Sequence, residues 1–320
     1  MISILNRILL VRGGAIGDFI LTLPALKALR DSCPRPQIEI LGNEHIAVLA
    51  ESRFYAQAVR SIEFGALSSF FARNSKLSNE LVSYFASFDL IISYLYDPDG
   101  VFEENLRHCG VKNLIRGPAK IDGGSHAARQ LALPIEELGA RVEDFAARLY
   151  PSSEDRHAAV KVLSDLARPI VAFHPGSGSE IKNWPLENWI EIGNRLLAST
   201  DFSGSIVIVF GEADKRQATR LGSIWQSLRV RLVENLPLPH LAAVLEGTIF
   251  IGHDSGISHL AAAAGANCIL IFGPTDPAIW APLNENVCVL HAPDRDLHRL
   301  PVDVVCDALG QALIRIGIRT

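Results

Sequence analysis

The feature that most constrains the fold of this chain is an alternation of short apolar runs and amphipathic stretches that occurs twice along its length. Each apolar run has the length of a strand, and apolar residues then recur at helical spacing. Such alternation predicts parallel β-sheets covered by helices on both faces. The expected strands are residues 8–11, 37–41, 90–93 and 113–115 in the first half and 170–174, 205–210, 229–233, 248–251 and 268–272 in the second.

The length of the chain favours two domains. A chain of 320 residues exceeds an ordinary single core, and two units of about 150 residues are the natural expectation. A polar, turn-rich segment at 151–156 reads as the linker. We therefore expect an α/β protein with doubly wound domains at 1–150 and 157–300. The second domain should contain helices at 187–197, 215–227, 240–245 and 257–264, and a last amphipathic helix should span 302–316.

Composition excludes several classes of protein. The net charge of −5, without a basic stripe, argues against a general nucleic-acid binder. The longest apolar run, 260–272, contains Asn267 and is too short to cross a bilayer. No cleavage site follows the apolar start of the chain. The cysteines form no CxxC pair, which predicts a reducing, cytoplasmic compartment; they are Cys33, Cys109, Cys268, Cys288 and Cys306.

In doubly wound sheets, ligands bind beyond the carboxyl ends of the strands, so the turns that follow the strands are the places to look for chemistry. The first such turn is RGGAIGD, residues 12–18, where glycines at 13, 14 and 17 permit a tight turn and Asp18 enters the next helix. A plain helix-start carboxylate is the alternative for Asp18. A dinucleotide fingerprint is disfavoured, because Arg12 stands where it needs glycine and no acidic residue ends the second strand.

The turns after the first two strands of the second half point to a phosphate and a sugar. HPGSGSEIKNWP, 174–185, supplies glycines, small hydroxyls such as Ser177, and Lys182, which together suit an anion. A surface turn with a solvated lysine is the alternative. In FGEAD, 210–214, Glu212 could bind sugar hydroxyls, or it could simply cap the helix that follows.

The last two runs suit a diphosphate and the wall of a nucleotide pocket. In IGHDSGISHLAAAAGA, 251–266, Asp254, Ser255 and Gly256 turn into a helix whose free N–H groups form a ready diphosphate site. The histidines of this run could suggest a metal, but no further ligands lie at a useful spacing, so we expect none. In FGPTDPAIWAP, 272–282, two prolines stiffen a loop that can wall a pocket.

Taken together and in this order, these runs resemble glycosyltransferase family 9, the bacterial heptosyltransferases of lipopolysaccharide assembly, over nearly the whole chain. The resemblance implies a GT-B fold, in which two Rossmann-like domains face a central cleft. It also implies an inverting reaction without a catalytic metal. The acceptor would bind the N-terminal domain and the nucleotide sugar the C-terminal domain.

Motif matching to the family implies roles for individual residues. Asp18 would be the general base, beside an acceptor-side loop formed by Gly13, Gly14 and Gly17. His259 matches a motif histidine to which we give no chemical role. The donor-binding positions would be Ser177, Lys182, Glu212, Asp254, Ser255 and Gly256.

The resemblance further implies a substrate class and a place for the last helix. The donor would be ADP-heptose, with no other cofactor, and the acceptor a lipopolysaccharide or another lipid-linked or oligosaccharide glycan of the cell envelope. Peripheral association with the inner face of the membrane is left open. In a GT-B architecture the amphipathic helix 302–316 would pack back on the first domain through an apolar stripe formed by Val305, Leu309, Ala312, Leu313 and Ile316.

The sequence departs from the family pattern at several positions, so two alternative functions are also considered. Gly13-Gly14-Ala15 replaces a serine-rich turn, and Leu236-Pro237-Leu238-Pro239 stands where the family has a glycine before a helix. The acceptor-side domain is nearly neutral, although an anionic acceptor would favour a basic surface. The alternatives are a degenerate transferase-like protein that binds nucleotides or serves as a scaffold, and, less favoured, an NAD-dependent dehydrogenase.

Overall fold

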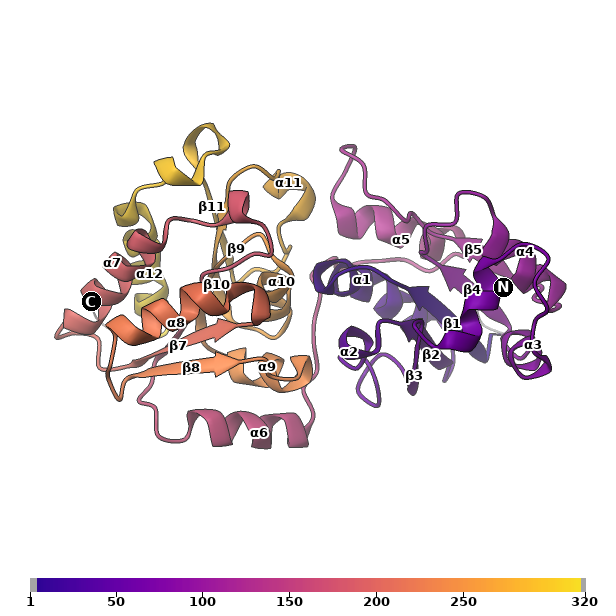
Figure 1. Ribbon diagram of the computed structural model, residues 1–320, viewed down its shortest axis with the longest axis horizontal. Coiled ribbons are helices and arrows are strands. Elements are labelled where there is room, and N and C mark those ends of the chain that lie inside the picture. The colour runs from indigo at the N-terminus through magenta and orange to yellow at the C-terminus, as the bar shows by residue number, and fades with distance from the viewer. Residues whose placement is uncertain (1–4, 318–320) are drawn as a thin grey trace. The chain divides into compact units, whose positions relative to one another are not determined.

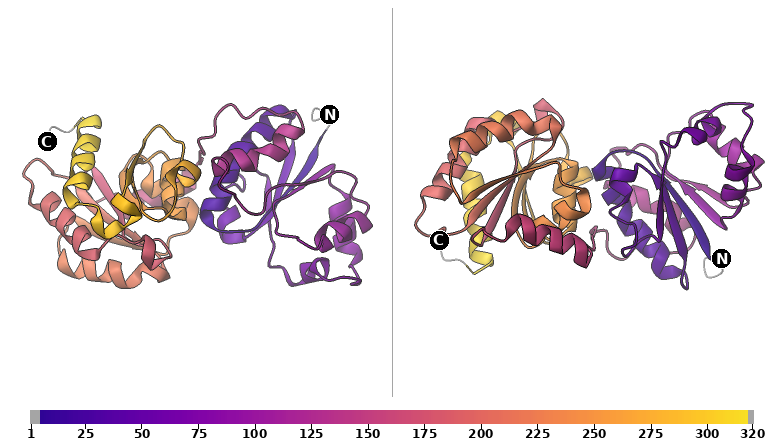
Figure 2. Two further views of the ribbon diagram at one scale, coloured as in Figure 1. Left: turned by 90° about the horizontal axis from the view of Figure 1, so that it is seen from above. Right: turned by 60° about the horizontal axis from the view of Figure 1, so that its bottom comes forward.

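The computed structural model describes residues 5–317, and the chain divides into two compact units, Met1–Phe145 and Ala146–Thr320 (Figures 1 and 2). The end positions 1–4 and 318–320 of the expected domains lie outside the described residues. The expected linker at 151–156 is wrong, because residues 140–152 carry no regular structure and helix α6 already begins at Ser153. The polar run there is a capping box, in which Ser152 and Asp155 exchange hydrogen bonds at the start of the helix.

The first unit contains a parallel sheet in the order β3-β2-β1-β4-β5. Its strands are β1 (Arg7–Arg12), β2 (Gln37–Gly42), β3 (Ala58–Ser61), β4 (Leu90–Ser93) and β5 (Leu114–Arg116). Its helices are α1 (Ile16–Ser32), α2 (Glu44–Ala47), η2 (Gly65–Phe71), α3 (Asn79–Ala86), α4 (Val101–His108) and α5 (Ala127–Glu137). Side chains of η2, α3 and α4 pack on one face of the sheet, while α1 and α5 pack against each other.

The second unit contains a parallel sheet in the order β11-β10-β9-β6-β7-β8. Its strands are β6 (Ile170–His174), β7 (Ser205–Phe210), β8 (Val230–Glu234), β9 (Ile249–His253), β10 (Asn267–Phe272) and β11 (Val287–His291). Its helices are α6 (Ser153–Leu163), η3 (Glu180–Lys182), α7 (Leu186–Ala198), η4 (Glu212–Asp214), α8 (Lys215–Ile224), α9 (Leu238–Leu245), α10 (Gly256–Ala263), α11 (Pro277–Trp280), η5 (Pro293–Arg295), η6 (Leu297–Arg299) and α12 (Val302–Arg315).

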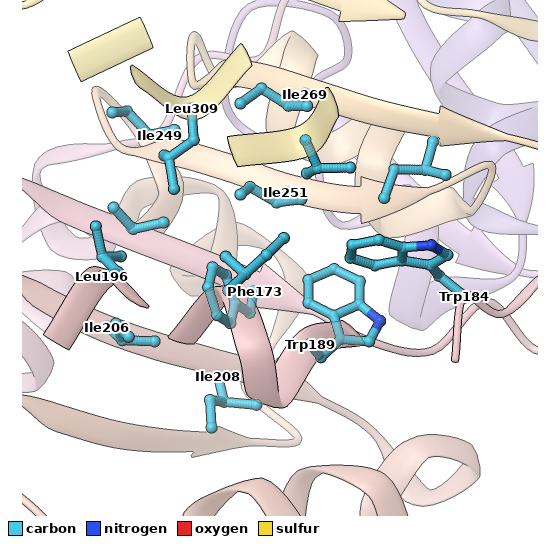
Figure 3. Packing of buried hydrophobic residues seen from close by; sticks show 14 of the residues in the cluster. Phe173, Trp184, Trp189, Leu196, Ile206, Ile208, Ile249, Ile251, Ile269 and Leu309 are labelled. Atoms are coloured by element: carbon cyan, nitrogen blue, oxygen red, sulfur yellow. The ribbon is translucent and has the colours of Figure 1, made fainter. Parts of the chain in front are cut away.

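Helices cover both faces of this second sheet, as the alternation of apolar runs predicts. On one face, α7, α8 and α12 bury aromatic and aliphatic side chains against the central strands, among them Phe173, Trp184 and Trp189 (Figure 3). On the other, α10 packs on β9 and β10, and α9 packs on α6 and α10. The central strands are buried along their whole length, which is why they read as continuous apolar runs.

The last helix, α12, contributes its apolar stripe to the second unit. The stripe formed by Val305, Leu309 and Leu313 is at most 4% exposed, and it belongs to the core of the second unit. There α12 packs on α7, β9 and β10. The sheet of their own unit buries these side chains, and the packing of the helix on the first domain stays a prediction.

The strand orders create a switch point in each sheet. Connections leave β1 toward β2 in one direction and reach β4 on its other side, and β6 lies in the same way between β7 and β9. Such points leave a crevice at the carboxyl ends of the strands, where open α/β sheets bind ligands. The loops that follow β1, β6 and β9 are the ones that carry the motifs.

Within residues 5–317, no helix is long and apolar enough to span a membrane.

Candidate active site

The loops after β6 and β9 meet at the switch point of the second sheet. The Nζ atom of Lys182, in η3, lies 2.7 Å from Oδ2 of Asp254, which follows β9 directly. The two residues are 72 positions apart in sequence. Their proximity confirms the expectation that both loops reach one edge of the sheet. The alternative of a solvated surface lysine is wrong, since Lys182 is 28% exposed and forms an ion pair.

Asp254 also ties a third loop to this edge. Its Oδ2 atom accepts a hydrogen bond of 2.8 Å from Oγ1 of Thr275, in the loop between β10 and α11. The Asp254 side chain is 11% exposed, so its charge is shielded from water and compensated by Lys182. An ammonium group carries three N–H donors, and Asp254 takes one of them. The Lys182 head group is thus fixed in place while keeping donors for an anion.

Helix α10 begins beside this ion pair. The hydroxyl of Ser255 caps the helix by accepting the N–H of Ser258 at 3.3 Å. Ser258 in turn donates its hydroxyl to the carbonyl of His253. The first N–H groups of a helix have no partner within it, so those of Gly256 and Ile257 face the turn at the positive end of the helix dipole. An anion next to Lys182 would meet these donors.

The loop between β6 and α7 packs closely at its start. A Cβ atom on Gly176 would lie 1.7 Å from Oδ1 of the buried Asp214, so only glycine fits there. Gly178 has a φ of +73°, a left-handed conformation that glycine adopts freely. The hydroxyl of Ser177 lies 2.9 Å from the carbonyl of Ser179 and 2.7 Å from Oδ1 of Asn183. Ser177 therefore stabilises the turn that leads to Lys182.

Glu212 occupies the next strand end along the same edge. It follows β7, the neighbour of β6, and is exposed at the start of η4. Its Oε1 atom accepts a hydrogen bond of 2.9 Å from Asn235, which follows β8. Glu212 caps neither η4 nor α8, whose N-cap residues are Gly211 and Asp214. Glu212 is thus oriented by Asn235 and open to a polar ligand.

No cluster of three or more metal-ligating side chains occurs between residues 5 and 317. His259 is buried within α10. The other histidines at this sheet edge, His174 and His253, are buried and contact backbone groups.

In the first unit, Asp18 lies in the first turn of α1, directly after β1. Its Oδ2 atom accepts the N–H of Ala15 at 3.0 Å, which completes the start of the helix. Its Oδ1 atom lies 3.7 Å from Nη2 of Arg12. The Arg12 side chain is only 5% exposed, and burial lowers the pKa of its guanidinium, an effect that the nearby Asp18 opposes. Asp18 itself remains 35% exposed and so accessible to a substrate hydroxyl.

The turn before Asp18 depends on its glycines. Gly14 has a φ of +94°, and a Cβ atom there would lie 2.8 Å from Oδ2 of Asp18. Gly13 approaches Leu95, where a Cβ atom would come within 3.3 Å. Asn43, at the end of β2, donates to the carbonyl of Gly14 at 2.9 Å. Gly17 is the second residue of α1. The acceptor-side loop predicted from the sequence is thus a tight turn built around the Asp18 carboxylate.

The sequence-predicted residues therefore fall into two groups. The second unit brings together Lys182 and the turn at Asp254, with Ser177 in the adjoining loop and Glu212 at the neighbouring strand end. Asp18 and its glycine turn belong to the first unit. The sequence analysis gave no role to three polar residues that position the site, namely Asn43, Asn235 and Thr275, although Thr275 lies within the run 272–282. Each of them follows a strand of one of the two sheets, and this position is the signal that could have found them.

Comparison with known proteins relates this chain to one family of glycosyltransferases. The family model for glycosyltransferase family 9 (heptosyltransferase) matches residues 107–300. Lipopolysaccharide heptosyltransferase 1 of Escherichia coli (strain K12) is 25% identical over 333 residues, which cover 95% of this chain and 99% of that protein.

Solved structures share the fold. E. coli ADP-heptose LPS heptosyltransferase II has a TM-score of 0.79 at 16% identity, with 97% of this chain and 99% of that chain covered. E. coli heptosyltransferase WaaC with ADP has a TM-score of 0.73 at 20% identity, with 96% and 99% covered. The iron-containing dodecameric glycosyltransferase TibC from enterotoxigenic E. coli H10407 has a TM-score of 0.54 at 15% identity, with 94% and 68% covered. The predicted GT-B type fold with two Rossmann-like domains is confirmed.

Proposed function

Because the chain belongs to glycosyltransferase family 9, we propose that it transfers a heptose from ADP-heptose to a glycan acceptor of the cell envelope, with inversion at the anomeric carbon. The observation that carries this proposal is the ion pair of Lys182 and Asp254 beside the start of α10. The acceptor would be a lipopolysaccharide precursor, since relatives of similar length are lipopolysaccharide heptosyltransferases.

The geometry of the second unit supports a diphosphate ligand. Lys182 offers a positive charge held by Asp254, and the first N–H groups of α10 converge on the same turn. Glu212, oriented by Asn235, offers a carboxylate to the hydroxyl groups of a ribose or a sugar. That the family includes heptosyltransferases, and that one structural relative was solved with ADP, favours adenosine diphosphate as the nucleotide.

The first unit supports a general base. Asp18 is held by Ala15 and Arg12, yet it remains partly exposed at a strand end. In the reaction we propose, Asp18 removes the proton of an acceptor hydroxyl, and the oxygen forms a bond to the anomeric carbon from the face opposite the nucleotide. The bond from that carbon to the diphosphate oxygen breaks, and its electron pair leaves with the diphosphate. Lys182 and the α10 N–H groups stabilise that developing charge.

The test of this proposal is Asp18→Asn in a transfer assay with ADP-heptose and a heptose-deficient lipopolysaccharide acceptor. Asparagine keeps an oxygen that can accept the N–H of Ala15, but it cannot take a proton at neutral pH. Turnover should fall by about 10²–10⁴. Affinity for ADP, measured by calorimetry, should change little, because the proposed donor residues belong to the other unit.

Asp31→Asn is the matched control. It removes one carboxylate from the other end of α1, where Asp31 pairs with Lys27 on the surface. It should leave turnover near that of the wild type. Turnover of Asp18→Asn within a few-fold of the wild type would contradict the assignment of the base. ADP binding without transfer by the wild-type protein would favour a binding or scaffold role instead.

We also propose that the reaction needs no metal, and loss of activity in a chelator would contradict this.

A further inference from the structure

The loop from Gly176 to Trp184 carries both Ser177 and Lys182, and one buried side chain contacts its two ends. His253, the last residue of β9, is fully buried. Its Nε2 atom accepts the backbone N–H of Trp184 at 2.8 Å, and its Nδ1 atom lies 3.4 Å from the carbonyl oxygen of Gly176. A single imidazole thus bridges the first and last residues of the loop.

The chemistry of these contacts fixes the state of the ring. A backbone N–H can only donate, so Nε2 of His253 must carry a lone pair, and the proton of the neutral ring must sit on Nδ1. Nδ1–H then donates to the carbonyl of Gly176. Protonation would place a hydrogen on Nε2, which would then face the N–H of Trp184 as a second donor, and this hydrogen bond would be lost. Burial accordingly lowers the pKa of His253 to about 3. The ring is therefore neutral, in one tautomer, throughout the physiological range.

The surroundings hold both the ring and its partner in place. His253 packs edge-to-face on Trp189, with ring centroids 5.4 Å apart. Trp184 packs on the same Trp189 at 5.8 Å, and its Nε1 atom donates to the carbonyl of Leu300 at 3.1 Å. The far end of the loop is thus anchored in the core, as the positions of Trp184 and Trp189 in Figure 3 show.

We infer that His253 is a positioning residue for donor binding. By bridging the two ends of the loop 176–184, His253 holds Lys182 and Ser177 where the diphosphate binds. The inference rests on the proposed function of that loop. Together with its neighbour Asp254, His253 fixes the loop at three points, namely Gly176, Lys182 and Trp184. Without the bridge, a buried N–H and the Gly176 carbonyl lose their partners, and the loop is closed for a smaller fraction of the time. The apparent dissociation constant of the ligand rises in proportion.

Two substitutions separate this role from a purely structural one. His253→Phe keeps the ring and its contact with Trp189 but removes both hydrogen bonds. His253→Gln retains an acceptor that can reach the N–H of Trp184 and a donor for Gly176. Ile249→Val is the control, because it removes a buried methyl group from the same strand, at the end far from the loop. The probes are ADP binding by calorimetry and the hydrogen-exchange rate of the Trp184 amide without nucleotide.

His253→Phe should weaken ADP binding about tenfold and speed exchange of the Trp184 amide by at least as much. His253→Gln should recover most of both, and Ile249→Val should change neither. Unchanged ADP affinity in a folded His253→Phe protein would overturn the inference, as would equal losses in the phenylalanine and glutamine variants. If the wild type does not bind ADP, the proposed function fails, and the exchange rates still show whether His253 closes the loop. If His253→Phe does not fold, His253→Leu, which also removes both hydrogen bonds, replaces it in both measurements, with the same expected results.

Discussion

Lowering the pH from 7 to 5 should destabilise the second unit, and His253 should account for about 2 kcal/mol of the loss. The pKa of His253 falls from the ordinary 6.5 to about 3 in the folded chain, first because of burial and then because of the neighbouring His174. The hydrogen bond to the Gly176 carbonyl and then the carboxylate of Asp254 oppose this lowering of the pKa. The folded protein therefore stays unprotonated at this residue across the whole interval.

The sign follows from which state binds the proton. Between about pH 6.5 and pH 3 the unfolded chain protonates His253 and the folded chain does not, so stability is full above this window and is lost as the pH falls through it. At pH 5 an unfolded histidine is almost fully protonated, which is worth about 2 kcal/mol relative to pH 7. Burial also lowers the pKa of His174, so its contribution has the same sign.

The assay is urea unfolding at pH 7 and pH 5, followed by tryptophan fluorescence. All 4 tryptophans of the chain lie in the second unit, so the signal reports that unit alone; they are Trp184, Trp189, Trp225 and Trp280. Carboxylates elsewhere in the chain change the free energy of unfolding between the two pH values by the same amount in the wild type and in His253→Gln, so their effect cancels in the comparison. The variant should lose about 2 kcal/mol less than the wild type between the two pH values. Equal losses would refute the reasoning.

Two further substitutions test the donor loop itself. Lys182→Ala should weaken ADP binding about 10–100-fold and slow transfer as well, because it removes a charged donor and leaves Asp254 uncompensated. Calorimetry measures the affinity and the transfer assay the rate. Unchanged affinity would contradict the diphosphate assignment. Gly176→Ala should cost about 1–3 kcal/mol in urea unfolding, because its Cβ atom would overlap the carboxylate of Asp214. Gly211→Ala, whose Cβ atom would meet its nearest neighbour at 3.5 Å, should be nearly neutral, and equal costs would contradict the packing argument.

The sequence predicts the central strands of both sheets because those strands are buried on both faces. β6, β7 and β9 are buried at every position, and such strands read as unbroken apolar runs. The edge strand β3 was not predicted from the sequence, because its residues are half-buried or exposed and form no such run. The edge strand β11 was not among the expected strands either, although its first four residues are apolar. The linker was misplaced for a related reason, since a capping box and a loop are both polar and differ only in the bonds that they form.

The site was predictable to the extent that it depends on local turns. Lys182 and Asp254 each follow a strand, and parallel strands bring their carboxyl ends to one edge, so their meeting follows from topology. The partners that fix them do not follow in this way. Thr275, Asn235 and Asn43 act across loops far apart in sequence, and no local pattern says which polar side chain will reach which acceptor. The apolar stripe of α12 shows the same limit, since amphipathicity reveals a buried face but not the surface that buries it.

Asp18 shows how two interpretations that compete in the sequence can both apply in the structure. Its Oδ2 atom performs the helix-start role by accepting the N–H of Ala15, and its Oδ1 atom lies toward the buried Arg12. A carboxylate has about four lone-pair positions, so one hydrogen bond at the helix start leaves others for the proton of a substrate. The helix-start bond fixes the orientation of the group, and a base must be oriented before it can act. The structural role is therefore a condition of the catalytic one that we propose, and Asp18→Asn, which keeps the former and removes the latter, is the substitution that separates them.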